Sequence, residues 1–148
     1  MKYIKRYILR LQMIRALKKI KRVSLSDATR LWSLSNTSFI GPVGFSSKIL
    51  PEYDLYKKLA LETEIEDDDI QALLQHESAS VAVYAIEMLI LRECRNLAST
   101  LTVLADRSES VTIRIGCYEY SSPLCEYAAK RTEEAELNKT VQETGTVP

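Results

Sequence analysis

A repeat of about thirty residues in the second half of the chain most constrains what this sequence can fold into. The second copy begins 30 residues after the first, and apolar and serine positions then coincide. The aligned positions are Leu74, Ser78, Ser80 and Val81 with Leu104, Ser108, Ser110 and Val111. Each copy predicts a short helix, a polar turn and a second helix. The two helices are expected over 68–75 and 80–94 in the first copy, and over 97–105 and 110–120 in the second. Helix pairs at a fixed offset are typical of an α-solenoid, in which each pair buries its apolar face on the next.

The repeat resembles the short bacterial HEAT-like repeats over about residues 67–121. Their second helix carries an Asp five residues before a Val and an Ala four residues after it, matched by Asp106 and Val111 in one copy and by Val81 and Ala85 in the other. The resemblance implies an all-α stack of helix pairs. It also suggests an immunity-type binding protein that neutralises a cognate toxin. The β-branched alternation over 111–115 fits a strand equally well, so helix and strand both stay open for residues 110–120.

The remaining segments complete a single helical domain over 1–148. Only 4 Gly and 4 Pro among 148 residues argue against a loop-rich β-sandwich. We expect a basic amphipathic helix over 1–22, an irregular loop over 35–50 and a frayed polar tail over 137–148. The predicted fold class is therefore all-α, a short HEAT-like α-solenoid preceded by an amphipathic helix.

Positive charge is concentrated at the N-terminus. Residues 1–50 hold eleven Lys and Arg against the single acid Asp27, although the formal net charge of the whole chain is zero. A basic amphipathic helix can attach to nucleic acid or to an anionic membrane, pack as a first core helix, or act as a targeting segment. The residues predicted for such a basic surface are Lys5, Arg6, Arg15, Lys18, Lys19 and Arg22.

Negative charge is concentrated in the middle of the chain. Six of the eight residues over 62–69 are acidic, and the other two are Thr63 and Ile65. One or two acids suffice to cap the helix that follows, and the surplus motivates a docking surface for a basic protein. Tyrosines in this half suit such a contact. The predicted partner-binding residues are Glu64, Glu66, Asp67, Asp68, Asp69, Glu77 and Tyr84.

Chemistry-bearing motifs are sparse. His76 is the only histidine, and the three cysteines form no CxxC pair, so we expect neither an enzyme nor catalytic residues, and no metal or cofactor. Free thiols indicate a reducing, cytoplasmic compartment. The sequence thus favours a protein-binding module that docks a basic partner, which the resemblance implies is a toxin, with nucleic-acid or anionic-membrane attachment as the alternative. It does not fix the partner or the oligomeric state.

Overall fold

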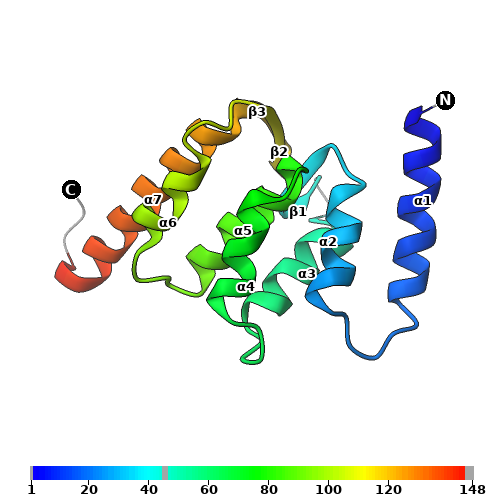
Figure 1. Cartoon of the computed structure of the whole chain (residues 1–148), viewed down its shortest axis with the longest axis horizontal. Coiled ribbons are helices and arrows are strands. Elements are labelled where there is room, and N and C mark those ends of the chain that lie inside the picture. Colours follow the sequence, from blue (N-terminus) through cyan, green and yellow to red (C-terminus); the bar gives the residue numbers. More distant parts are fainter. Residues whose placement is uncertain (1, 45–46, 146–148) are drawn as a thin grey trace.

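The computed structural model describes residues 2–44 and 47–145, which form a mixed α/β structure (Figure 1). The expected loop over 35–50, the helix over 1–22 and the tail over 137–148 each include residues outside that description, at 45–46, 1 and 146–148 respectively. The elements in chain order are α1 (Lys2–Leu17), α2 (Leu25–Ser33), β1 (Thr37–Val43), α3 (Pro51–Ala60), α4 (Asp67–Ala72), the 3-10 turn η1 (Leu73–Gln75), α5 (Ala79–Leu91), α6 (Leu97–Leu101), the 3-10 turn η2 (Thr102–Leu104), β2 (Ser110–Gly116), β3 (Tyr118–Pro123) and α7 (Leu124–Thr144).

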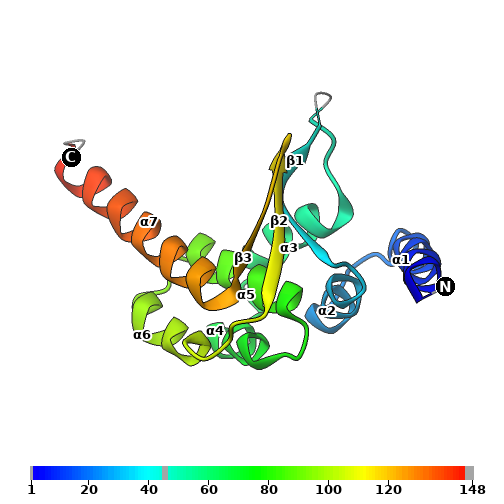
Figure 2. The same ribbon diagram turned by 90° about the horizontal axis from the view of Figure 1, so that it is seen from above.

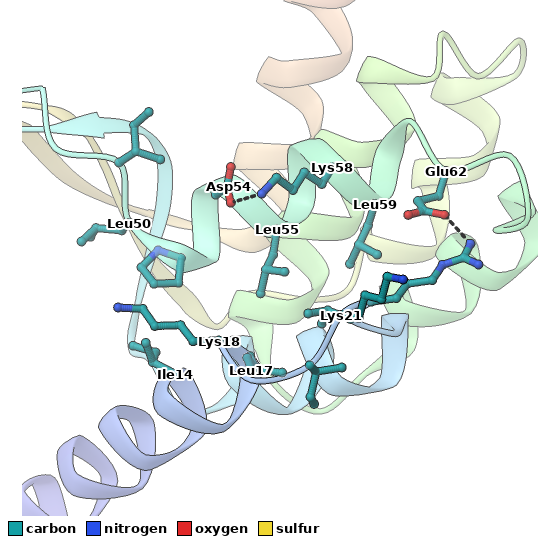
Figure 3. Close-up of a pocket in the computed structure, with 15 residues that line it drawn as sticks. Ile14, Leu17, Lys18, Lys21, Leu50, Asp54, Leu55, Lys58, Leu59 and Glu62 are labelled. Carbon is teal, nitrogen blue, oxygen red and sulfur yellow. Dashed lines mark hydrogen bonds and ion pairs between the residues drawn. The ribbon is translucent and has the colours of Figure 1, made fainter.

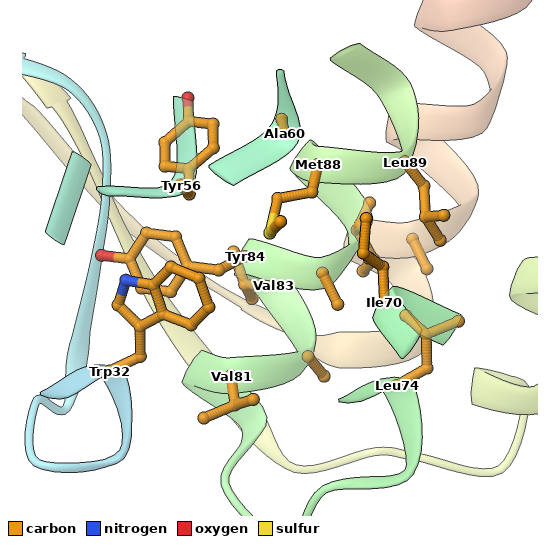
Figure 4. Packing of buried hydrophobic residues seen from close by; sticks show 14 of the residues in the cluster. Trp32, Tyr56, Ala60, Ile70, Leu74, Val81, Val83, Tyr84, Met88 and Leu89 are labelled. Carbon is orange, nitrogen blue, oxygen red and sulfur yellow. The ribbon is translucent and has the colours of Figure 1, made fainter. Parts of the chain in front are cut away.

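Helix α5 runs through the centre of the molecule and is buried along most of its length. Every residue from Ser80 to Leu89 is buried, because α2, α3, α4, α7 and two strands all pack against this helix. Trp32 of α2 stacks on Tyr84 of α5 with ring centroids 4.8 Å apart (Figure 4). A helix that is apolar on all sides in this way belongs in a core.

The strands form a three-stranded mixed sheet in the order β1-β2-β3. Strand β1 pairs with β2 in parallel, and β2 pairs with β3 in antiparallel fashion through a two-residue turn at Gly116 and Cys117. Gly116 has φ of 60°, which suits the first position of a type II′ hairpin turn. Val111 and Ile113 alternate inward along β2 and are buried, as expected of a strand with one face on the core.

Two core tyrosines bond to the backbone of β1, the strand that borders the sheet on one side. The backbone N–H of Phe39 donates to the hydroxyl of Tyr84 at 2.8 Å, and the Tyr56 hydroxyl donates to the carbonyl of Ile40 at 3.1 Å. Burial raises the pKa of both phenols above the ordinary value, with nearby carboxylates adding to the effect. These hydroxyls therefore stay protonated, and they provide hydrogen-bond partners for the Phe39 N–H and the Ile40 carbonyl of β1.

Helix α7 is fastened to the core through a buried carboxylate. Glu87 of α5 accepts from the Tyr127 hydroxyl at 2.5 Å and from two nitrogens of Arg131 at 2.7 and 2.9 Å. Burial raises the pKa of Tyr127, and the Glu87 carboxylate raises it further. The arrangement satisfies a charge that would otherwise be costly to bury.

The expected all-α solenoid is wrong. The helices predicted over 68–75, 80–94 and 97–105 are present as α4 with η1, α5, and α6 with η2, but the segment 110–120 is the β2–β3 hairpin. The alternation of β-branched residues suits a pleated strand, and Gly116 provides the turn. Without the fourth helix there is no second helix pair, and the stacked repeat does not form.

Two other segments differ from expectation. Residues 37–43 of the expected loop form β1, because pairing with β2 supplies their backbone hydrogen bonds. The local sequence around Gly41 and Pro42 does not indicate this pairing. The tail is helical as far as Thr144, where Gly145 in the left-handed conformation with φ of 64° ends α7. Ser24 three residues before Asp27, and Pro51 as a first helical residue, each predict a helix start from local sequence. Both starts are confirmed: Ser24 caps α2 together with Asp27, and Pro51 begins α3.

Candidate functional site

Helix α1 stands at one end of the molecule, and most of its residues are exposed. It packs mainly against α2, and of its residues only Leu17 is buried (Figures 1 and 2). Met13 and Ile14 near its C-terminal end are partly buried against the core. All residues over 2–9 are exposed, so any function of this part of α1 depends on what its exposed faces carry.

The side of α1 that meets the domain is largely polar. Arg6 donates to the side chain of Asn36 at 3.0 Å, and the Arg10 Nε donates to Glu52 Oε1 at 2.5 Å. Together with Met13 and Leu17, these residues recur at steps of three and four and so share one side of the helix. One ion pair, one hydrogen bond and the apolar contacts of Met13, Ile14 and Leu17, rather than the main apolar face, therefore hold α1 in place.

The main apolar face of α1 is left uncovered. We call it the apolar stripe, and it comprises Tyr3, Ile4, Tyr7, Ile8 and Leu11. At 3.6 residues per turn it is rotated by roughly a third of a turn from the side that meets the domain. Tyr3 is 77% exposed, Ile4 62%, Tyr7 59% and Ile8 47%. Large apolar side chains gathered in this way mark an interaction surface.

Unpaired cations flank the apolar stripe on the side of Lys5 and continue beyond the end of α1, whereas Lys2 lies on nearly the opposite side of the helix. Helix α1 contains five Lys or Arg and no acid. In the described part of the chain, the positive side chains of this region that make no ion pair and no side-chain hydrogen bond are Lys2, Lys5, Arg15, Lys18, Lys19 and Lys21. Of the predicted basic residues, Arg6 and Arg22 are engaged within the protein, and Lys5, Arg15, Lys18 and Lys19 are free.

A hollow of about 420 Å³ lies where the segment after α1 passes over α3 (Figure 3). Leu17, Leu55 and Leu59 form its buried apolar floor, and Ile20 and Ile49 are exposed beside it. Its volume is within the roughly 300–1,000 Å³ of small-molecule sites. Ile14 lines it and also follows Tyr7 and Leu11 at helical spacing, so the apolar stripe leads into the hollow.

Three of the six acids in the run over 62–69 are engaged by arginines of the same chain. Arg22 donates to Glu62 at 2.6 Å and to Glu64 at 2.7 Å. These hydrogen bonds, with Glu62 first, raise the pKa of the Arg22 guanidinium. Asp67 accepts from Arg92 at 2.6 Å. The acids predicted to bind a partner thus partly neutralise the protein's own cations.

The other predicted partner-binding residues lie in different surroundings. The N–H of Glu66 donates to Asp69 at 3.2 Å and closes the start of α4. Asp68 and Glu77 are exposed. Tyr84 is fully buried under Trp32, so it contributes to the core and not to a surface.

No catalytic constellation is evident among the described residues. Nδ1 of His76 accepts from the backbone N–H of Ser78 at 3.0 Å, and the three cysteines are separate thiols. Over residues 2–44 and 47–145, no cluster of three or more His, Cys, Asp or Glu side chains is placed to hold a metal ion. In the same residues no helix has both the length and the apolar character needed to cross a membrane.

Comparisons of the chain with protein-family models, curated proteins and solved structures found no match. The resemblance to HEAT-like repeats is therefore wrong on two grounds, since no family model supports it and a sheet replaces the expected fourth helix. The immunity-type interpretation depended on that resemblance and is withdrawn with it.

Sequence reasoning identified the positive charge of this region but missed its arrangement. The apolar stripe was visible as helical periodicity, yet the pairing of Arg10 with Glu52, 42 residues apart, decides which side faces the domain. The hollow also joins segments distant in sequence, 14–23 with 49–62, and no local signal pointed to it.

Proposed function

We propose that this protein attaches peripherally to anionic membrane surfaces through α1. The observation that carries the proposal is the exposed apolar stripe together with the six Lys and Arg side chains, on α1 and just beyond its end, that make no ion pair in the described part of the chain. A helix of this kind lies in the membrane interface, with apolar side chains among the acyl chains and cations near the lipid phosphates. Sixteen residues give α1 a length of roughly 24 Å, enough to present several side chains at once.

The magnitudes support reversible attachment. Fully burying a large apolar side chain contributes about 1.5–3 kcal/mol, so residues such as Ile4 and Ile8, already partly covered, contribute roughly 1 kcal/mol each. Each Lys or Arg near an anionic surface contributes about 1 kcal/mol more. Neither term is sufficient alone, and their sum gives binding that salt and lipid composition can regulate.

The same features favour a membrane over nucleic acid. A phosphate backbone would engage the free cations and leave the apolar stripe in water, because double-stranded nucleic acid presents few apolar groups outside its grooves. A lipid interface accommodates both. This difference makes the apolar stripe, and not the charge, the discriminating feature.

The first experiment compares two neighbouring side chains on different faces of α1. Ile8 belongs to the apolar stripe, whereas Leu9 is 50% exposed and lies nearly opposite the centre of the stripe. Each of the two is replaced by Ser. Co-sedimentation with vesicles of phosphatidylcholine and phosphatidylglycerol should weaken about fivefold for Ile8→Ser, from roughly 1 kcal/mol lost. Leu9→Ser should change affinity by less than twofold. Equal effects of the two changes would contradict the proposal.

The second experiment tests charge. Lys5→Gln with Arg15→Gln should weaken vesicle binding about 30-fold, from roughly 2 kcal/mol lost, and the matched variant Arg95→Gln with Lys139→Gln should leave it unchanged. Raising the salt from about 0.1 M to about 1 M shortens the Debye length from about 10 Å to about 3 Å and should release the protein. Equal binding to pure phosphatidylcholine vesicles would refute an anionic requirement.

Other uses of α1 give distinct results. Salt-sensitive binding to DNA or RNA that Ile4→Ser with Ile8→Ser leaves intact, without vesicle binding, would favour nucleic-acid attachment. A dimer in sedimentation velocity that the same double variant converts to monomer would make the apolar stripe a contact between copies. Docking of a basic protein on Asp68 and Glu77 stays a prediction, tested by changing both to Lys.

A further inference from the structure

The geometry points to the hollow between residues 14–23 and α3 as a binding site for a single-chain anionic amphiphile, with its acyl chain on the apolar floor and its head group on Lys18 and Lys21. The inference deepens the proposed membrane attachment and rests on it for the source of such a ligand. The hollow adjoins the apolar stripe but is lined by none of its residues, so the two can be tested with separate variants.

The floor of the hollow suits an acyl chain. Leu17, Leu55 and Leu59 are at most 9% exposed and pack side by side, whereas Ile20 and Ile49 at the opening are 45% and 59% exposed. Ile20 and Ile49 therefore expose apolar surface to water, and a chain of methylene groups lying on the floor would cover it. Each methylene buried contributes about as much as any other, so affinity should increase with chain length.

The charges around the hollow select an anion. Its two acids are already paired, Asp54 with Lys58 at 2.7 Å and Glu62 with Arg22 at 2.6 Å. Lys18 and Lys21 make no ion pair among the described residues, which leaves two uncompensated positive charges at the opening. Figure 3 shows Lys18 toward the Leu50 end and Lys21 toward the Glu62 end of the hollow. A carboxylate or phosphate head group would complement this charge.

The test uses the full chain with dodecanoate, dodecyl phosphate and neutral dodecanol, all below the concentrations at which they aggregate. Methyl NMR should show shifts at Ile20, Ile49 and Leu55, and calorimetry should show both anions binding about tenfold or more tightly than dodecanol. Tighter binding of dodecyl phosphate would identify a phospholipid-derived ligand, and tighter binding of dodecanoate a free fatty acid. Shifts confined to the apolar stripe, or equal affinity for dodecanol, would overturn the inference.

Variants distinguish failure of this site from failure of membrane attachment. Lys18→Gln with Lys21→Gln should weaken dodecanoate about tenfold, whereas Lys19→Gln, which lies between them but does not line the hollow, should have no effect. Ile49→Asn should weaken dodecanoate about fivefold and leave vesicle binding unchanged. Ile4→Ser with Ile8→Ser should do the reverse.

An unchanged dodecanoate affinity in the Lys18 and Lys21 variant would overturn the head-group assignment. Vesicle binding without any dodecanoate binding would overturn the site and leave the proposed attachment standing. Dodecanoate binding without vesicle binding would support the site and refute the attachment.

Discussion

The pairing of Arg10 with Glu52 should be the main energetic link between α1 and the domain. The Glu52 side chain is completely buried, Arg10 is 18% exposed, and their side chains meet at 2.5 Å. The second carboxylate oxygen of Glu52 has no hydrogen-bond partner among the described residues. Over residues 2–44 and 47–145, Arg10 is the one cation paired with this carboxylate, so its removal should be far more costly than that of an exposed arginine.

Replacing Arg10 by Met keeps much of the apolar stem and removes the charge. Breaking a buried pair from one side costs about 3–5 kcal/mol. Movement of α1 would admit water to Glu52 and reduce that cost, so we expect the free energy of unfolding to fall by about 3 kcal/mol. Glu52→Gln added to Arg10→Met removes the buried charge and should restore about 2 kcal/mol relative to Arg10→Met alone. Glu52→Gln alone completes the double-mutant cycle, from which the coupling between the two side chains is obtained.

Urea unfolding followed by circular dichroism provides the free energies. Trp32, the only tryptophan, donates to the backbone carbonyl of Glu52 at 3.2 Å, so its fluorescence reports the same region independently. Arg15→Met, on the exposed side of α1, is the matched control and should change stability by less than about 0.5 kcal/mol. A loss below about 1 kcal/mol for Arg10→Met, or a double variant no more stable than the single one, would refute the reasoning.

Three further predictions concern the rest of the fold. Arg92→Gln should destabilise the protein by about 2–4 kcal/mol in urea unfolding. Arg92 bonds Asp67 and three backbone carbonyls, which belong to the last residue of α3 and the loop that follows it. A loss below about 1 kcal/mol would contradict that role. Arg107 lowers the pKa of Glu109, so the associated stability is present above the ordinary carboxyl pKa and is lost as the pH falls through the lowered value. In NMR titration, Arg107→Gln should raise the pKa of Glu109 toward the ordinary carboxyl value, and an unchanged pKa would show that another group is responsible. Gly116→Ala should cost about 1–2 kcal/mol because φ is 60° there, whereas Gly116→Asn should cost less, and equal costs would argue against backbone strain.

Local signals in the sequence predicted most helices correctly. The Ser24 cap, the Pro51 start and the apolar periodicity of 80–94 each depend on neighbours within a few residues, and those elements are present. The sheet depends on partners far apart, since Thr37 pairs with Thr112. No periodicity within 35–50 indicates this distant pairing, so the sequence predicts a loop where β1 forms.

The hairpin was a different kind of error. The alternation of Val111, Ile113 and Ile115 was visible as a strand pattern, but the thirty-residue repeat favoured a helix there. Side-chain period is the more direct physical signal, because it states which residues reach the core. For the candidate site, the sequence showed where the charges were but not which were already paired: Arg22 and Arg92 engage acids that looked free.

The parallel pairing of β1 with β2 has a consequence for biosynthesis. Strand β1 leaves the ribosome well before β2, and at about 5–20 residues per second the wait is roughly 4 to 15 seconds. Tyr56 and Tyr84, whose hydroxyls bond to β1, are translated within that interval. The nascent chain can therefore dock β1 on these tyrosines before its permanent neighbour has been synthesised, which would limit its capture by another chain on the same messenger.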